Sequence, residues 1–235
     1  MVLARECDIP KSSTHHLLNM MLDHHFVTYY EEEHAWGLGV ASFEIGASYL
    51  RSRPLQRLGR QRLVALTTQT RKTSHLAILH GVDVLYIDKE EPPRDVPRLI
   101  TEVGVRLPAH LTSVGIAILA NLPTQQVRAL YDNRQFVNRT GVGPRDLRDL
   151  LPILERVREL GYAYDMQMTT PGVCCVAAPV FARDGQPTAA LGITLLASAP
   201  GEGEIVKLGT ALKKESRRLS RALGWRSQED GTDSS

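Results

Sequence analysis

The sequence predicts an α+β protein in which an N-terminal winged helix-turn-helix is joined by a linker helix to a larger domain. Two observations point to this fold. Residues 1–39 read as helix, turn, helix and hairpin, which is the order of a winged helix-turn-helix. After residue 53, strand-like segments pair across tight turns and alternate with helical ones, which favours a mostly antiparallel sheet flanked by helices over a doubly wound parallel sheet.

The N-terminal segments supply the helix-turn-helix and its wing. Residues 2–7 read as the end of a helix, and Pro10 suits the first turn of a new one. A helix is expected from Lys11, because the next apolar residues form one helical stripe: Leu17, Leu18, Met21 and Leu22. Residues 26–30 and 35–38 are β-prone and flank a polar tip, which predicts a hairpin.

The next stretch marks a boundary. Residues 40–50 are apolar at helical spacing, and the following Arg-Ser-Arg-Pro sequence breaks that helix. We therefore expect the winged helix-turn-helix over residues 1–39, a linker helix over 40–53 and the larger domain over 54–226. The polar residues 227–235 are expected to be a disordered tail.

The larger domain alternates helices and strands. Helices are predicted over residues 55–70, 113–121, 124–131, 147–160 and 205–223. Strands are predicted over residues 75–80 and 82–88, on either side of Gly81, and over 173–181 and 188–196, on either side of a turn sequence.

Composition and cysteine content argue against a membrane protein, a disulfide-rich protein and a metal-binding protein. A chain of 235 residues, 43% of them hydrophobic, can form a small domain and a medium one. It contains no apolar run long enough for a transmembrane helix and no signal-peptide pattern, so we expect no membrane contact and a cytoplasmic protein. Cys7, Cys174 and Cys175 do not suggest a disulfide framework, and no spacing of Cys and His resembles a metal site. Neither a metal nor a cofactor is predicted.

Charge is unevenly distributed, although the net charge is only +2. The first fifty residues carry two basic residues, Arg5 and Lys11, against seven acidic ones. Five arginines then follow in quick succession: Arg51, Arg53, Arg57, Arg60 and Arg62. Any affinity for DNA therefore depends on few phosphate contacts in the first fifty residues or on that arginine cluster.

Several segments in order resemble one known family. They are IPKSSTHHLL at residues 9–18, HAWGLG at 34–39, LPAHLTSVGIAILA at 107–120, GYAYD at 161–165 and GVCCVAAPV at 172–180. Together they are similar to the IclR family of bacterial transcriptional regulators over nearly the whole chain. The resemblance implies a GAF-like domain that binds a small organic acid or aromatic effector, and homodimers or homotetramers that bind double-stranded operator DNA.

The sequence departs from the family in two respects. The family usually has a complete helix before the segment that opens this chain, so the first helix of the helix-turn-helix is expected to be missing and Leu3, Leu17 and Leu18 to be exposed. The family also often has basic residues where this chain has His16 and Ile116.

The predicted recognition helix offers short polar side chains for DNA. In a helix-turn-helix, the first turns of this helix read base edges in the major groove. The candidates are Lys11, Ser12, Ser13, His15 and His16. From the residues alone, a solvated helix face is an equal alternative. The acidic tip of the hairpin argues against deep phosphate contact there.

The resemblance also implies an effector site. It consists of the start of the helix after Thr112, an aspartate, a cysteine and small residues on the last strand: Ser113, Val114, Gly115, Asp165, Cys175, Gly192 and Thr194. From the residues alone, that helix start either presents free N–H groups to an anion or is merely capped by Thr112 or Ser113. Some members carry serine at the position of Gly192, so this chain has one hydrogen-bonding group fewer.

A cysteine-dependent enzyme or a small-molecule-binding protein, with an N-terminal segment that does not bind DNA, is the alternative hypothesis. An activated thiol needs a base nearby, and His75, His80 and His110 are candidates without a spacing that ties them to Cys175. The strand around Cys174 and Cys175 is apolar, which favours an inert thiol. No catalytic residue is therefore assigned, and a non-enzymatic regulator is predicted.

Overall fold

The computed structural model describes residues 2–52, 54–93, 101–196 and 200–226, so the predicted disordered tail at 227–235 lies outside the described residues. The chain divides into two compact units, Met1–Arg53 and Pro54–Ser235. The described parts of the chain include no helix with both the length and the apolar character needed to cross a membrane.

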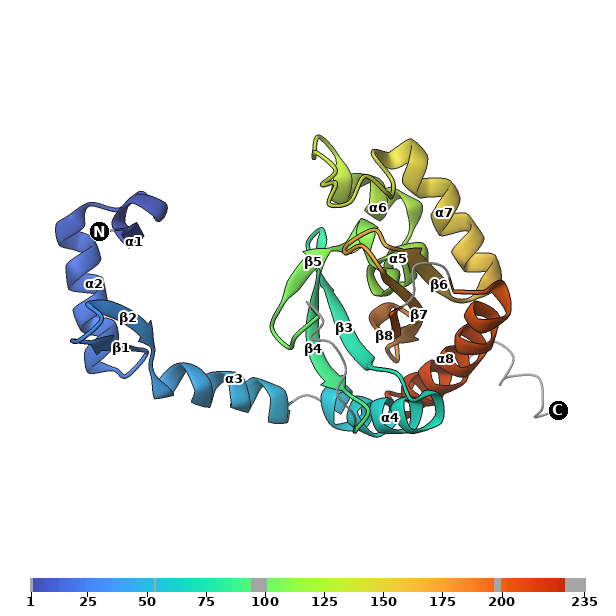
Figure 1. Cartoon of the computed structure of the whole chain (residues 1–235), viewed down its shortest axis with the longest axis horizontal. Helices are drawn as coiled ribbons and strands as arrows, with labels where there is room; N and C mark the ends of the chain where they lie inside the picture. The colour runs from blue at the N-terminus through green and yellow to red at the C-terminus, as the bar shows by residue number, and fades with distance from the viewer. Residues whose placement is uncertain (1, 53, 94–100, 197–199, 227–235) are drawn as a thin grey trace. The chain divides into compact units, whose positions relative to one another are not determined.

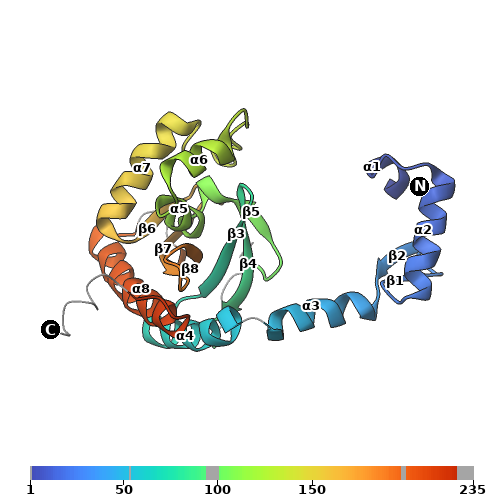
Figure 2. The ribbon, with the colours of Figure 1, turned by 180° about the vertical axis from the view of Figure 1, so that it is seen from behind.

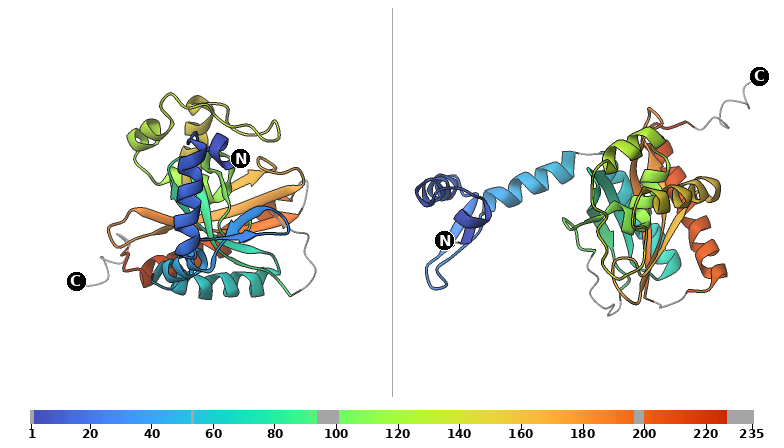
Figure 3. Two further views of the ribbon diagram at one scale, coloured as in Figure 1. Left: turned by 90° about the vertical axis from the view of Figure 1, so that its left-hand side faces the viewer. Right: turned by 90° about the horizontal axis from the view of Figure 1, so that it is seen from above.

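The N-terminal unit consists of helices and one hairpin, in the order expected of a winged helix-turn-helix. Helix α1 (Val2–Glu6) precedes α2 (Lys11–Asp23), which packs against the hairpin of β1 (Val27–Tyr30) and β2 (Ala35–Leu38), and α3 (Val40–Ser52) follows (Figure 3). The hairpin pairs Val27 with Leu38 and Tyr30 with Ala35. Gly39 lies between β2 and α3. This position requires glycine, because a Cβ atom there would lie 2.1 Å from the carbonyl oxygen of His25.

This unit buries little of its apolar surface. Among its described residues only Ala4 and Val27 are buried, and no residue of α2 is. The expected exposure is confirmed for Leu3 and Leu17, which are 45% and 46% exposed, whereas Leu18 is half-buried. These side chains line an apolar hollow of about 470 Å³ between the helices and the hairpin.

The C-terminal unit is a six-stranded antiparallel sheet in the order β5-β4-β3-β8-β7-β6 (Figure 1). Its strands are β3 (Ser74–His80), β4 (Asp83–Glu90), β5 (Arg106–Pro108), β6 (Ala163–Met166), β7 (Val173–Phe181) and β8 (Pro187–Leu196). Its helices are α4 (Pro54–Thr70), the 3-10 turn η1 (Ala109–Leu111), α5 (Ser113–Ala120), α6 (Thr124–Tyr131), α7 (Leu147–Leu160) and α8 (Glu202–Ala222). The predicted fold class is confirmed; the sequence patterns missed the short strands β5 and β6.

The two faces of the sheet differ in the size of their side chains and in the helices that cover them. Helices α4 and α8 pack on one face against large aliphatic side chains such as Leu76, Leu191 and Leu195, and α5 lies within the curl of the other face (Figures 1 and 2). The face beneath α5 carries small residues at paired positions: Ala77 with Ala190, and Ala163 with Ala177 and then Gly192. Small residues let the helix approach the sheet closely, and all eight residues of α5 are buried.

Gly115 is one of the close contacts that fix α5. A Cβ atom on Gly115 would lie 2.2 Å from the carbonyl oxygen of Ala109, and backbone atoms cannot move aside as a flexible side chain can.

Replacement of Gly115 by alanine is therefore expected to lower the free energy of unfolding by about 1–3 kcal/mol, the usual cost of overpacking. Urea unfolding followed by circular dichroism measures the change. Gly203→Ala in α8 is the matched control, since a Cβ atom there has no neighbour within 4 Å. Equal stability of the two variants would contradict the tight seating of α5.

Candidate functional site

Three of the predicted effector-site residues form one row across neighbouring strands. Asp165 on β6 pairs with Cys175 on β7, and Cys175 pairs with Thr194 on β8. Directly paired residues of an antiparallel sheet point to the same face. Here that face is the one covered by α5, because the intervening residues Cys174, Val176 and Ile193 pack into the core on the α4 and α8 side.

Asp165 joins this row to the start of α5. The backbone N–H of Ser113 donates a hydrogen bond of 2.9 Å to Oδ2 of Asp165, and the hydroxyl of Thr112 accepts from the N–H of Gly115 at 3.1 Å. The capping alternative therefore holds for Thr112, and the carboxyl group of Asp165 takes the place of an external anion at Ser113. Oδ1 of Asp165 is buried and has no hydrogen-bond partner among the described residues.

Burial governs the protonation of this row. It raises the pKa of Asp165 to about 7, against the opposing effect of the N–H of Ser113. It also raises the pKa of the Cys175 thiol, with a further contribution from the nearby Asp165, and that of the Tyr86 phenol on β4. The row is therefore close to neutral in weakly acidic solution.

Thr194 connects the row to a histidine. The hydroxyl of Thr194 lies 2.7 Å from Nε2 of His75 on β3 and 3.4 Å from Sγ of Cys175. Burial, and secondarily the charge of Lys89, lowers the pKa of His75 to about 3, so the imidazole is neutral. Its ring meets that of Tyr86 edge-on, with centroids 5.6 Å apart.

This arrangement does not activate a nucleophile. His75, one of the candidate bases, contacts Thr194 rather than the thiol, and the raised pKa of Cys175 keeps it protonated. Across the described part of the chain, no three side chains of His, Cys, Asp or Glu converge as metal ligands do.

The side chain of Val114 on α5 packs against Gly192 on β8, where the absence of a side chain leaves room for it. A Cβ atom on Gly192 would lie 2.8 Å from Cγ1 of Val114, so the valine side chain occupies the space that a larger residue on β8 would need. Gly115, another predicted site residue, packs closely against the backbone of Ala109.

The five candidate DNA contacts lie on α2. All five side chains are exposed: Lys11, Ser12, Ser13, His15 and His16. Thr14 between them donates a hydrogen bond to the carbonyl of Pro10.

Two members of the arginine cluster form ion pairs within the protein. Arg60 pairs with Asp88 and Glu90, and Arg62 pairs with Glu215, all within the C-terminal unit. The expectation that these two arginines are available for phosphates is therefore wrong; the side chains of Arg51 and Arg53 lie outside the described residues.

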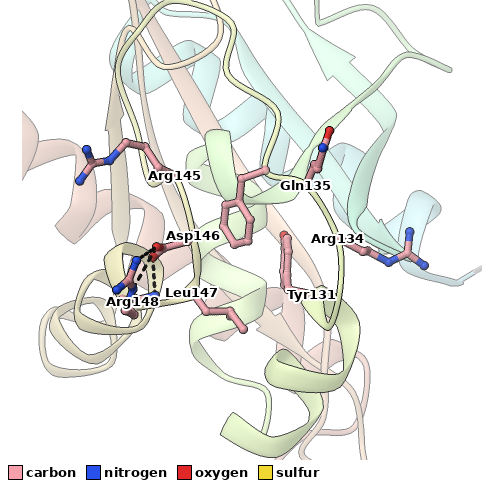
Figure 4. A pocket seen from close by; sticks show the side chains of 8 residues that line it. Tyr131, Arg134, Gln135, Arg145, Asp146, Leu147 and Arg148 are labelled. Carbon is pink, nitrogen blue, oxygen red and sulfur yellow. Dashed lines mark hydrogen bonds and ion pairs between the residues drawn. The ribbon is translucent and has the colours of Figure 1, made fainter.

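A second hollow, of about 510 Å³, lies between the end of α6 and the start of α7 (Figure 4). Its floor is the neighbouring rings of Tyr131 and Phe136, whose centroids are 4.9 Å apart. The guanidinium groups of Arg134 and Arg145 point away from these rings, and Arg148 is bound to Asp146 (Figure 4).

Comparison with known proteins identifies the family. Residues 47–221 match the model of the bacterial transcriptional regulator IclR C-terminal domain. The chain belongs to the IclR family. An IclR-family protein is a transcriptional regulator and not an enzyme, which agrees with the unactivated thiol of Cys175.

Relatives extend the similarity over most of the chain. The HTH-type transcriptional regulator XynR of Escherichia coli is 30% identical over 217 residues, which cover 92% of this chain and 86% of that protein. The acetate operon repressor of Salmonella typhimurium is 30% identical over 94% of this chain and 81% of its own length. The IclR crystal structure from Thermotoga maritima superposes with a TM-score of 0.77 at 26% identity, covering 95% of this chain and 90% of that one.

The family resemblance named Asp165, Cys175 and Thr194, which the structure brings to one face of the sheet, but it did not name His75, the partner of Thr194. A histidine within the otherwise apolar strand 75–79 was the available signal, and its link to β8 appears only when β3 and β8 are paired.

The pKa values of Asp165 and His75 predict opposing effects of pH on stability. Folded Asp165 holds its proton up to about pH 7, whereas an unfolded aspartate loses it near pH 4, so this residue favours folding increasingly as pH falls through that range. His75 stays neutral down to about pH 3 and acts in the opposite direction.

Asp165→Asn removes only the first effect. Relative to this variant, the parent chain is expected to gain unfolding free energy as the pH is lowered from 7.5 to 5, as measured by urea unfolding. A constant difference between parent and Asp165→Asn would show that Asp165 titrates normally.

The Val114 and Gly192 pair predicts a rescue. Gly192→Ser alone should lower the unfolding free energy by about 1–3 kcal/mol through overpacking, and adding Val114→Ala should recover much of that loss. A double-mutant cycle by thermal denaturation tests this, and additive effects would refute the steric coupling.

Proposed function

We propose that this IclR-family regulator is a repressor whose affinity for operator DNA is controlled by a small organic acid or aromatic effector. The effector would bind beneath α5 beside Ser113, Val114, Gly115, Asp165, Cys175, Gly192 and Thr194. The unpartnered Oδ1 of Asp165 carries this proposal, because a buried polar atom without a partner is a natural contact for a bound ligand. The Salmonella relative is an acetate operon repressor, which supports the sign of regulation.

The proposed control is a shift between conformations. A ligand changes an equilibrium only by its difference in affinity for the two states. The effector would contact α5 and strands β6, β7 and β8. A small displacement of α5 over the small residues of the sheet would therefore alter several of these contacts together. Operator affinity would then respond by the same coupling free energy.

The proposed recognition helix is α2, which lies in a DNA-binding region of residues 1–39. Residues 40–53 would connect this region to the effector domain of residues 54–226. Its exposed Lys11, Ser12, Ser13, His15 and His16 carry donors and acceptors suited to base edges and phosphates. Glu31, Glu32 and Glu33 at the wing tip would lie away from the phosphates. This action on bacterial DNA would take place in the cytoplasm.

A homodimer is the proposed minimal unit, with a homotetramer as its larger assembly. Helix-turn-helix proteins usually bind paired half-sites, which requires two reading helices. On α3, Val40, Phe43 and Ile45 are 60%, 74% and 58% exposed, an apolar surface that a second copy would cover.

Fluorescence anisotropy of the chain with DNA flanking its own gene, against a scrambled fragment, tests the DNA claim. Specific binding should weaken between 50 and 200 mM salt because phosphate contacts release counterions. Lys11→Ala should weaken binding and reduce the salt slope by about one. Lys214→Ala, the same charge change at an exposed position of α8, is the control. Absence of specific binding at low salt would overturn the proposal.

A further inference from the structure

The end of α8 and the turn between β7 and β8 form one positively charged surface. A hollow of about 720 Å³ lies there. Three of the seven described residues that line it are arginines, Arg183, Arg221 and Arg226, and none of the seven is acidic. The hollow belongs entirely to the C-terminal unit and is separate from the polar row beneath α5.

The two segments that carry these arginines are held together by defined contacts. The rings of Phe181 and Trp225 stack with centroids 5.2 Å apart and an angle of 22° between their planes. Ser220 bonds to both segments, because its hydroxyl accepts from the N–H of Phe181 and its carbonyl accepts from the N–H of Trp225, each at 2.9 Å. A Cβ atom on Gly224 would lie 3.5 Å from the side chain of Arg183, so that side chain runs along the end of α8. The arginines therefore start from a folded framework, which lowers the entropic cost of binding.

Two of the three arginines carry charges that no carboxylate neutralises. Arg183 and Arg226 are exposed, and neither forms an ion pair with a described residue. The neighbouring Asp184 accepts a hydrogen bond of 3.0 Å from the N–H of Gln186 within the turn. Guanidinium groups around one hollow repel one another, and a bound anion relieves that repulsion. Phosphate is the anion that the planar fork of arginine binds best.

The proposed DNA-binding region is poor in such charges. Residues 1–50 contain only two basic residues, Arg5 and Lys11, and Arg5 already lies 3.6 Å from Glu6. Much of the affinity of a protein for DNA comes from cations that neutralise phosphates. A regulator with this N-terminal region therefore needs cations from another part of its chain.

We propose that Arg183, Arg221 and Arg226 bind backbone phosphates of the duplex on which the regulator sits. This inference rests on the proposed function and adds a second DNA contact, on the C-terminal unit. The contact supplies affinity without sequence specificity, because phosphates are the same at every base pair.

Fluorescence anisotropy of the full chain tests the proposal with operator and scrambled duplexes between 50 and 200 mM salt. The double variant Arg183→Gln/Arg226→Gln should bind about five- to tenfold more weakly for each arginine lost at 0.1 M salt, and its salt slope should fall by about two. Both duplexes should be weakened by the same factor, so the ratio of specific to scrambled binding stays constant. The melting temperature should not change, because both side chains are exposed.

Two controls isolate the effect of charge at this surface. Arg156→Gln removes an exposed arginine of α7 that has no ion pair with a described residue, and it should leave the affinity and the salt slope unchanged. Arg183→Lys/Arg226→Lys keeps both charges and should keep the salt slope of the parent chain. Lys214, used above as a control, lies two turns before Arg221 on α8, about 10 Å away and outside the hollow.

The competing anion is the segment that follows the hollow, which contains Glu229, Asp230 and Asp233. If the arginines serve these carboxylates instead, the double glutamine variant will bind both duplexes like the parent chain, and the inference is overturned. It is also overturned if Arg156→Gln causes an equal loss, if the lysine variant loses the slope, or if only operator binding weakens.

The parent chain separates this failure from that of the proposed function. Specific operator binding that Lys11→Ala weakens and the double glutamine variant does not would remove only the contact on the C-terminal unit. Absence of specific binding by the parent chain would remove the regulator role and this inference with it.

Discussion

The close seating of α5 on small residues is the constraint on which the C-terminal unit depends. Alanine and glycine at paired positions of β3, β6, β7 and β8 let a fully buried, apolar helix lie against the sheet. Gly115 brings the first turn of that helix against the backbone of Ala109, and this places the N–H of Ser113 over Asp165. The polar row is therefore a product of helix packing: a side chain added at Gly115 or Gly192 would displace the helix and the carboxyl contact together.

The same sheet serves two purposes through its two faces. Beneath α4 and α8, large aliphatic side chains pack together, and the hydroxyl of Ser74 is bonded to Thr67 and to the carbonyl of Leu63. Beneath α5, buried polar atoms stay unpaired, and each costs about 1–3 kcal/mol of stability. The packing on the α4 and α8 face thus offsets the cost of these unpaired atoms. The regulator family to which the chain belongs needs such a division, since its ligand domain must fold without ligand and still respond to it.

Long segments with a clear period were predictable from sequence, and features set by distant partners were not. The stripe of Leu17, Leu18, Met21 and Leu22 and the apolar runs of β7 and β8 identify their elements locally. The three and four residues of β5 and β6 become strands only through pairing with β4 and β7. His75 and Thr73 lie beside the polar row through the register of β3 against β8, which no local pattern encodes. Arg60 and Arg62 looked free in the sequence because their carboxylate partners lie 28 and 153 residues away.

The sparse core of the N-terminal unit has a thermodynamic consequence for recognition. With only Ala4 and Val27 buried among its described residues, α2 is held by few tertiary contacts, and such regions open at low free-energy cost. If α2 binds the operator as proposed, part of the interaction energy with the operator must order this helix. Association of this kind has a large negative heat-capacity change and an unfavourable entropy. Operator occupancy by this regulator would therefore depend on temperature more steeply than contacts between two rigid surfaces require.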